Sequence, residues 1–259
     1  MTTFALPEEH PENPARTVLV VPHAGGGSAT ANPLRAALPE NWLVAGVAFG
    51  GRESRFLDEP PSRLADMVGD TVAAATEAAA LTGAAPVLLG QCSGALVAWL
   101  ATIELAGRGT TVPGLVLVSR SAPSWPGDLP DATAPDAEFI RQVIAMGSVP
   151  EEIADMPELL ELLLPSLRAD FTALAEWLPE RTDPAMTSPA PALALHAPDD
   201  AGCPVDSVEA WRGSVLALDI APVKGGHLLL ATNPVGVAAA LTAWLPPTAP
   251  EGDHRAGTV

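Results

Sequence analysis

The pentapeptide GQCSG at residues 90–94 restricts the possible folds of this chain more than any other segment. It follows an apolar run at residues 86–89 and precedes a helical pattern over 95–106. A reactive side chain between two glycines, where a strand passes into a helix, is typical of a sharp turn that holds a nucleophile in a strained backbone conformation. Strand and helix nearly touch in such a turn, so Gly90 and Gly94 are expected to be required there.

Segments of strand length alternate with helical patterns along the chain. The apolar segments lie at residues 17–21, 43–49, 86–89, 115–119, 191–196 and 216–220, and the helical patterns lie at 62–81, 95–106 and 235–244. We expect Ser62 to cap the first helix, and Gly83 and Gly107 to end the first and second. The alternation predicts an α/β fold with a mostly parallel central sheet and helices on both faces.

The chain is long enough to bury one core, because 48% of its 259 residues are hydrophobic. We expect a single domain over residues 1–246, and a disordered tail over 247–259, which is rich in proline, glycine and charge. The segment at about 136–178 has helical patterns and no strand. Two interpretations of it remain, a pair of crossover helices or an inserted helical lid over the strand ends, and we favour the lid.

Cys92 stands at the centre of the pentapeptide, where this kind of turn presents its nucleophile. The dipole and free N–H groups of the following helix favour a thiolate there and, during a reaction, an oxyanion. One alternative is that Cys92 is a buried structural cysteine. Another is that Ser93 is the nucleophile, but Ser93 is one position from the centre and is better placed to donate its backbone N–H to the oxyanion.

A base and an orienting acid are expected downstream, because this kind of fold places nucleophile, acid and histidine in that order along the chain. His227 lies in a glycine-rich loop between the last strand and the last helix, which is the position of the base, and His196 is the second candidate. Asp199 and Asp200 both follow the penultimate strand, and either carboxylate would orient the imidazole. Sequence geometry does not separate the two.

The glycine-rich loop at residues 22–28 (PHAGGGS) follows the first strand. Such a loop can bring a backbone N–H toward a reacting carbonyl. It could instead bind a phosphate, but the chain has no Gly-Lys-Ser/Thr sequence after it and no G-x-G-x-x-G with a downstream acid, so we expect no nucleotide site. No cluster of histidine, cysteine and carboxylate residues has the spacing of metal ligands, and we expect neither a metal nor a cofactor.

The charge and the cysteine content narrow the possible partners and location. The formal net charge is −18, with a single lysine, which disfavours nucleic acid and anionic membranes as partners. Cys92 and Cys203 are too few for a disulfide framework, so Cys203 is expected to be a free thiol. The first residues, 1–16, lack the basic and apolar stretches of a signal peptide, and no run of about 18 apolar residues predicts a membrane span. These features predict a cytoplasmic protein.

Together these segments resemble the type II thioesterases of polyketide and nonribosomal peptide pathways, which have the α/β-hydrolase fold. The resemblance covers about residues 18–245, with matches at VPHAGGGSA after the first strand, GRESR at 51–55, GQCSG, VSRSAP at 118–123, LPSLRADF at 164–171, and APDDAGCPVDSVEAW followed by GGHLLL. It implies His227 as the base and Asp200 as the acid. It also implies oxyanion donors on the backbone of Ala24 and Ser93.

The resemblance further implies a substrate held as a thioester on the phosphopantetheine arm of an acyl or peptidyl carrier protein. Members of this family hydrolyse stalled or wrong acyl groups in an acyl chamber under a helical lid, which here corresponds to the segment at 136–178. Three departures stand out. The usual pentapeptide is GHSMG, so that Gln91, Cys92 and Ser93 replace histidine, serine and methionine; PGRE becomes GGRE at 50–53; and Leu228 replaces an aromatic residue.

A cysteine nucleophile changes the expected reaction. Cys92 would take the acyl group as a new thioester, so the equilibrium constant of this loading step is near one and the step is reversible. The acyl group can then pass to an amine, a hydroxyl or a second carrier thiol, or to water. The alternatives are a small-molecule cysteine hydrolase of the dienelactone hydrolase type and a catalytically degenerate binding module. Arg52, Arg55 and Arg168 are candidates for carrier docking or, equally, for structural ion pairs.

Overall fold

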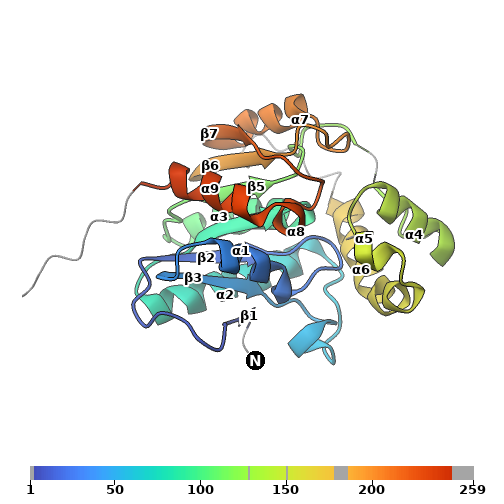
Figure 1. The fold of residues 1–259 in the computed structure, drawn as a ribbon, viewed down its shortest axis with the longest axis horizontal. Coiled ribbons are helices and arrows are strands. Elements are labelled where there is room, and N and C mark those ends of the chain that lie inside the picture. The colour runs from blue at the N-terminus through green and yellow to red at the C-terminus, as the bar shows by residue number, and fades with distance from the viewer. Residues whose placement is uncertain (1–2, 128, 150, 178–185, 247–259) are drawn as a thin grey trace, which may run out of the picture.

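A seven-stranded sheet forms the centre of the molecule (Figure 1). The computed structural model describes residues 3–127, 129–149, 151–177 and 186–246. Its strands are β1 (Phe4–Ala5), β2 (Arg16–Val21), β3 (Trp42–Val47), β4 (Val87–Gln91), β5 (Leu115–Val118), β6 (Ser188–His196) and β7 (Val215–Pro222). They lie in the order β1-β3-β2-β4-β5-β6-β7, and only the edge pair β1–β3 is antiparallel within this sheet. The predicted α/β fold with a mostly parallel sheet is confirmed.

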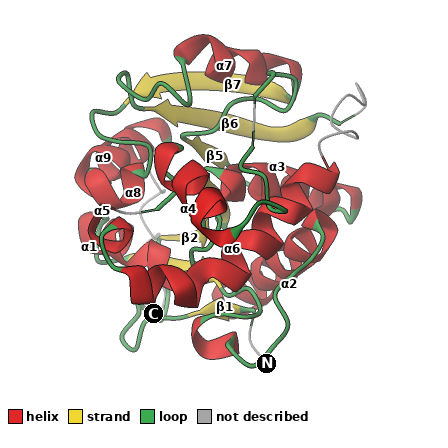
Figure 2. Ribbon diagram, turned by 90° about the vertical axis from the view of Figure 1, so that its right-hand side faces the viewer, coloured by secondary structure: helices red, strands yellow, loops and turns green. Residues whose placement is uncertain are grey.

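Helices cover both faces of the sheet (Figure 2). They are α1 (Asn32–Ala37), α2 (Leu64–Thr82), α3 (Ser93–Gly107), α4 (Asp136–Ala145), α5 (Glu151–Ala154), α6 (Pro157–Trp177), α7 (Val205–Glu209), α8 (Leu229–Thr232) and α9 (Pro234–Trp244), with 3-10 turns at Ser28–Ala31, Glu53–Arg55 and Ala210–Gly213. Helix α2 ends at Gly83 as predicted, because glycine accepts the φ of 75° found there. Asn233 caps α9 by accepting a hydrogen bond from Gly236 N at 2.9 Å.

Side chains of the inner strands point alternately to the two helical layers. In β2, Leu19 and Val21 belong to the core shared with α2 and α3. Val18 and Val20 belong to a second core shared with α1, α8 and α9. A parallel sheet that is buried on both faces has nearly continuous apolar strands, which explains why these strands were recognisable in the sequence.

Several predicted boundaries need correction. The N-cap of α2 is Arg63 and no side chain bonds there, so the prediction that Ser62 caps this helix was wrong. Helix α3 begins at Ser93, two residues before the predicted start, because the sharp turn leads directly into it. Strand β3 ends at Val47 and not at residue 49, and strand β1 was missed altogether.

The segment predicted to form a lid contains α4, α5 and α6. These helices lie together beyond one end of the sheet (Figure 1), and α6 runs through Pro165 without a break. Residues of α4 line a cavity with residues that follow β4 and β5, so the insertion covers the carboxyl ends of these strands. Its action as a lid remains a proposal. The predicted tail, 247–259, lies outside the described residues, and none of the described helices has the length and apolar character needed to cross a membrane.

Candidate active site

The pentapeptide forms a sharp turn between β4 and α3. Cys92 has φ of 52° and ψ of −119°, a conformation that is costly for a residue with a side chain. Its N–H donates to the Val118 oxygen of β5 at 2.8 Å. A Cβ atom on Gly90 would lie 2.1 Å from the Gly94 oxygen, and one on Gly94 would lie 2.3 Å from the Val21 oxygen. Both glycines are therefore required by the close approach of strand and helix.

His227 and Asp200 meet where β6 and β7 end. His227 lies in the loop between β7 and α8, and its Nδ1 is 2.7 Å from Oδ2 of Asp200, which lies in the turn after β6. The two side chains are only 10% and 6% exposed. Asp199 is exposed, and His196 lies at the end of β6 without lining the cavity that contains Cys92. The structure thus brings Asp200 and His227 together and leaves Asp199 and His196 apart.

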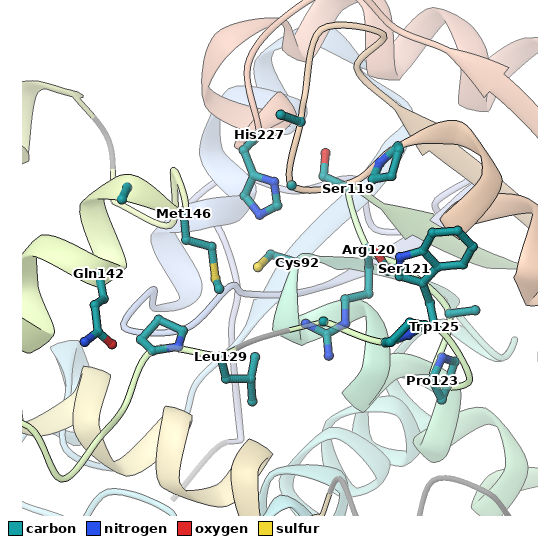
Figure 3. A pocket seen from close by; sticks show the side chains of 18 of the residues that line it. Cys92, Ser119, Arg120, Ser121, Pro123, Trp125, Leu129, Gln142, Met146 and His227 are labelled. Atoms are coloured by element: carbon teal, nitrogen blue, oxygen red, sulfur yellow. The ribbon is translucent and has the colours of Figure 1, made fainter.

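Cys92 and His227 line the same cavity (Figure 3). The Nε2 atom of His227 is buried and has no hydrogen-bond partner among the described residues. Burial opposes ionisation of the Cys92 thiol, but His227 and, more weakly, Arg120 and the Ser93 N–H lower its pKa to about 7. Burial also opposes a charged imidazole, but the thiolate and Asp200 raise the pKa of His227 to about 10. The arrangement favours a thiolate–imidazolium pair.

Alkylation by iodoacetamide tests this pairing. We expect the rate at Cys92 to rise with pH through a midpoint near the pKa of about 7, because only the thiolate reacts. In His227→Ala the stabilising charge is lost and burial remains, so the midpoint should move above the value of about 8.5 for a free cysteine. Peptide mass spectrometry separates Cys92 from Cys203. Equal midpoints in the wild type and in His227→Ala would contradict the ion pair.

The cavity around Cys92 has a volume of about 640 Å³. This is within the range of about 300–1,000 Å³ found for small-molecule sites. Its walls are mostly apolar and include Trp125 and Leu129 after β5, Met146 after α4, and Trp177 at the end of α6 (Figure 3 labels the first three). The inserted helices therefore shape the space in front of the sulfur atom.

The two predicted oxyanion donors occupy different positions. Ser93 is the first residue of α3, and its N–H is close enough to the sulfur of Cys92 to lower the pKa of the thiol. Ala24 is buried in the glycine-rich loop and lines a second cavity, of about 330 Å³, together with Gln91 and Leu228. The hydroxyl of Ser93 is buried and Ser93 is absent from the lining of the larger cavity, which favours Cys92 over Ser93 as the nucleophile.

A metal site and a second reactive thiol have little support in this region. Among the described residues, no three histidine, cysteine, aspartate or glutamate side chains gather as metal ligands would. Cys203 is a free, buried thiol, as predicted. Burial and the nearby Asp200 raise its pKa to about 11, so it stays protonated at neutral pH. That the protein needs no cofactor stays a prediction.

A family model described as "Thioesterase domain" matches residues 16–245. The match runs from the start of β2 to the residue after α9 and includes Cys92, Asp200 and His227. The chain belongs to the thioesterase domain family. This family membership agrees with the resemblance found in the sequence.

This thioesterase-family chain is also similar in sequence to individual thioesterases and in fold to solved structures. It is 27% identical over 221 residues to a probable anguibactin biosynthesis thioesterase, AngT of Vibrio anguillarum, with 83% of this chain and 86% of the relative covered. It is 29% identical to the thioesterase PikA5 of Streptomyces venezuelae, with 85% and 78% covered. The structure of BorB, a type II thioesterase from the borrelidin biosynthetic cluster, matches with a TM-score of 0.80 at 22% identity and covers 95% of this chain and 98% of BorB. The α/β-hydrolase fold of the thioesterases is confirmed.

A buried ion pair in this thioesterase-family chain fixes the glycine-rich loop. Arg52 donates to both carboxylate oxygens of Asp170 on α6, at 2.8 and 2.9 Å, and the two side chains are 6% and 0% exposed. Asp170 also accepts from Gly25 N at 2.8 Å, and Arg52 donates to the Gly26 oxygen at 3.0 Å. The ion pair thus joins the inserted helices to the loop that contains Ala24.

The protein should therefore be less stable to unfolding when the Arg52 side chain is removed. We expect Arg52→Ala to lower the free energy of unfolding by about 3–5 kcal/mol, because the Asp170 carboxylate would be left buried and unpaired. The matched control is Arg108→Ala, which breaks an exposed pair with Glu104 and should cost less than about 1 kcal/mol. Urea unfolding curves measure both. Equal small losses would show that the buried pair does not stabilise the fold.

Carrier docking and structural ion pairs were both left open for three arginines, and their contacts favour ion pairs. Arg52 is buried, as described above. Arg55 binds Asp58 and Asp70 at 2.8 and 2.7 Å, and Arg168 binds Asp136 and nearby carbonyl oxygens. All three guanidinium groups are therefore held in structural ion pairs.

Sequence reasoning missed the function of Gln91. Its side chain is buried, and its Oε1 accepts from Leu230 N at 3.0 Å. This bond ties the pentapeptide to α8, which follows the loop containing His227. The only signal in the sequence was that glutamine replaces the histidine usual at this position in the family that the chain resembles.

Proposed function

We propose that the chain is a type II thioesterase-like enzyme that holds acyl groups on Cys92 as a thioester. The groups would come from the phosphopantetheine arm of an acyl or peptidyl carrier protein. The enzyme then releases them to water or transfers them to an amine, a hydroxyl or a second carrier thiol. The observation that carries this proposal is that Cys92, at a strained turn, shares an apolar cavity with a His227 that is bonded to Asp200.

In the first step, the thiolate of Cys92 attacks the carbonyl carbon of the carrier thioester. The carbonyl oxygen becomes an oxyanion, and the backbone N–H of Ser93 stabilises it. Ala24, which lines the second cavity, stays a predicted second donor. The bond to the carrier sulfur then breaks, and His227 gives its proton to the departing thiolate. The products are free carrier thiol and an acyl thioester on Cys92, with His227 neutral and held in one orientation by Asp200.

In the second step, neutral His227 can take a proton from the acceptor as the acceptor attacks the acyl thioester. Collapse of the new oxyanion expels the Cys92 thiolate and restores the starting ion pair. Because donor and product of the first step are both thioesters, the free energy of acyl transfer to Cys92 is near zero and the step is reversible. A serine would instead form an oxoester in a downhill step. The cysteine therefore favours transfer to a strong nucleophile over simple hydrolysis.

The relatives support a carrier-bound substrate. AngT is named for anguibactin biosynthesis, and BorB comes from the borrelidin biosynthetic cluster. We infer that this chain also acts in natural-product biosynthesis, with α4 to α6 as the lid that selects the acyl chain. A cytoplasmic location, and the absence of nucleic acid and membrane partners, are part of the same proposal.

Substrate presentation separates this proposal from its alternatives. We expect turnover of acyl groups on a carrier protein, and little turnover of free lactones of the dienelactone type. The reverse preference would favour a small-molecule cysteine hydrolase. A protein that turns over neither, and whose Cys92 is alkylated no faster than free cysteine, would be a degenerate binding module.

A further inference from the structure

Arg120 places a cationic side chain in the wall of the larger cavity. Its side chain points into the space between Trp125 and Leu129, near Cys92 (Figure 3). Its Nε atom is buried and has no hydrogen-bond partner among the described residues, and its guanidinium forms no ion pair with any of them. Arg120 is half-buried, and its unpartnered Nε lies in the wall beside the nucleophile, so the guanidinium is available to bind an anionic group that enters the cavity.

The other described arginines differ from Arg120. Their guanidinium groups all bind carboxylates or carbonyl oxygens of the protein, namely those of Arg16, Arg35, Arg52, Arg55, Arg63, Arg108, Arg141, Arg168 and Arg212. The chain has a net charge of −18 and thus many carboxylates, yet no aspartate or glutamate is among the described residues that line this cavity. Among the described residues that line the cavity, Arg120 carries the only guanidinium group.

The backbone of Arg120 is held in place beside the nucleophile. Its oxygen accepts from Trp211 Nε1 at 2.8 Å. It lies two residues after Val118, whose oxygen binds the Cys92 N–H. The intervening Ser119 has φ of 50°, which is unfavourable for a residue with a side chain and turns the chain sharply at this point. The backbone position of Arg120 beside Cys92 is therefore set by the sheet.

We propose that Arg120 binds a carboxylate at the far end of the acyl group, so that the preferred substrate is the thioester of a dicarboxylic acid. This inference rests on the proposed function and names its substrate class. A guanidinium matches a carboxylate with two parallel hydrogen bonds, and this pairing is strong in an apolar cavity. The apolar walls fit the methylene chain between the carboxylate and the thioester.

A phosphate of the carrier arm is the other anion that an arginine could bind. In phosphopantetheine, the phosphate is at the opposite end of a long chain from the thioester sulfur. Arg120 lies close enough to the reacting sulfur to contribute to the lowered pKa of the Cys92 thiol. The acyl carboxylate is therefore the better match, and the test below separates the two.

The first test uses two alkylating agents and needs no turnover. Iodoacetate carries a carboxylate and iodoacetamide does not, so the ratio of their rates at Cys92 reports attraction of an anion, while the thiolate fraction cancels. We expect Arg120→Gln to lower this ratio about tenfold, the loss of one charge-assisted bond, and Arg120→Lys to lower it less. Arg108→Gln removes the same charge at the far end of α3 and should leave the ratio unchanged.

The second test compares glutaryl with 5-methylhexanoyl, a neutral group of similar shape, as thioesters on a carrier protein and on N-acetylcysteamine, which has no phosphate. We expect Arg120→Gln to reduce kcat/KM for glutaryl about tenfold more than for 5-methylhexanoyl, with both donors. Equal losses for the two acyl groups, seen only on the carrier, would assign Arg120 to the phosphate and overturn the proposal. An unchanged alkylation ratio would also overturn it. If the wild type turns over no thioester, the proposed function fails, while the alkylation ratio still decides whether Arg120 binds anions.

Discussion

Replacing Cys92 with alanine is expected to remove acyl transfer and hydrolysis, with a loss of about 10⁶ in kcat, the size seen when a nucleophile is removed from a catalytic triad. The cavity and the oxyanion donors would remain, so the variant should still bind the acylated carrier. Quantification of free acid and of acyl acceptor product under single-turnover conditions measures the loss. Cys203→Ser is the matched control, because Cys203 is also buried but has a raised pKa, and it should keep full activity.

Cys92→Ser gives the sharper form of this prediction. The acyl group would then be held as an oxoester, which reacts less readily with amines and thiols than a thioester does. We expect the ratio of free acid to transferred product to increase in Cys92→Ser relative to the wild type, measured with the same acceptor at the same concentration. An unchanged ratio would show that the sulfur atom does not determine the acceptor.

The second large effect is expected at Asp200. Asp200→Asn should lower kcat/KM roughly 10²- to 10⁴-fold, because the amide permits the wrong tautomer of His227 and no longer stabilises its charged form. The His227 Nδ1 to Asp200 Oδ2 distance of 2.7 Å is the contact that would be lost. Steady-state kinetics with one acylated carrier measures the effect.

Asp199→Asn is the matched control for Asp200→Asn. The two residues are neighbours in the same turn, and both changes remove one negative charge, but Asp199 is exposed. Its substitution should change kcat/KM less than about twofold, as expected for a screened surface charge. Equal effects of the two changes would mean that long-range charge, and not the contact with His227, explains the loss.

Much of the sheet could be predicted because its buried strands have continuous apolar sequences. Strands β2, β3, β4, β5 and β6 all overlap the predicted segments, and so does β7, although most of its side chains are not buried. Strand β1 could not be found, since it has two residues and exists only because Phe4 and Ala5 pair with Val47 and Gly46 of β3. Short elements such as α1 and α8 likewise depend on packing against the sheet and not on a local pattern.

The candidate site was predictable where chain order determines it. Cys92 and His227 were placed from the turn and from the order of the triad, and the structure puts both on one cavity. Asp199 and Asp200 could not be separated by sequence geometry, because adjacent residues of a turn point in different directions that depend on the backbone. The contacts of Arg52 with Asp170 and of Gln91 with Leu230 join residues 118 and 139 positions apart, which no local pattern reveals.

Intact mass spectrometry of the wild-type protein, mixed with an acylated carrier protein and quenched within seconds, tests the central claim most directly. The account predicts a mass increase equal to one acyl group, and peptide mapping should locate it on the peptide that contains Cys92. A thiol or amine acceptor should remove the acyl group, and Cys92→Ala should not acquire it. Turnover of the carrier thioester without any acyl group on Cys92, or with the group on Ser93, would contradict it.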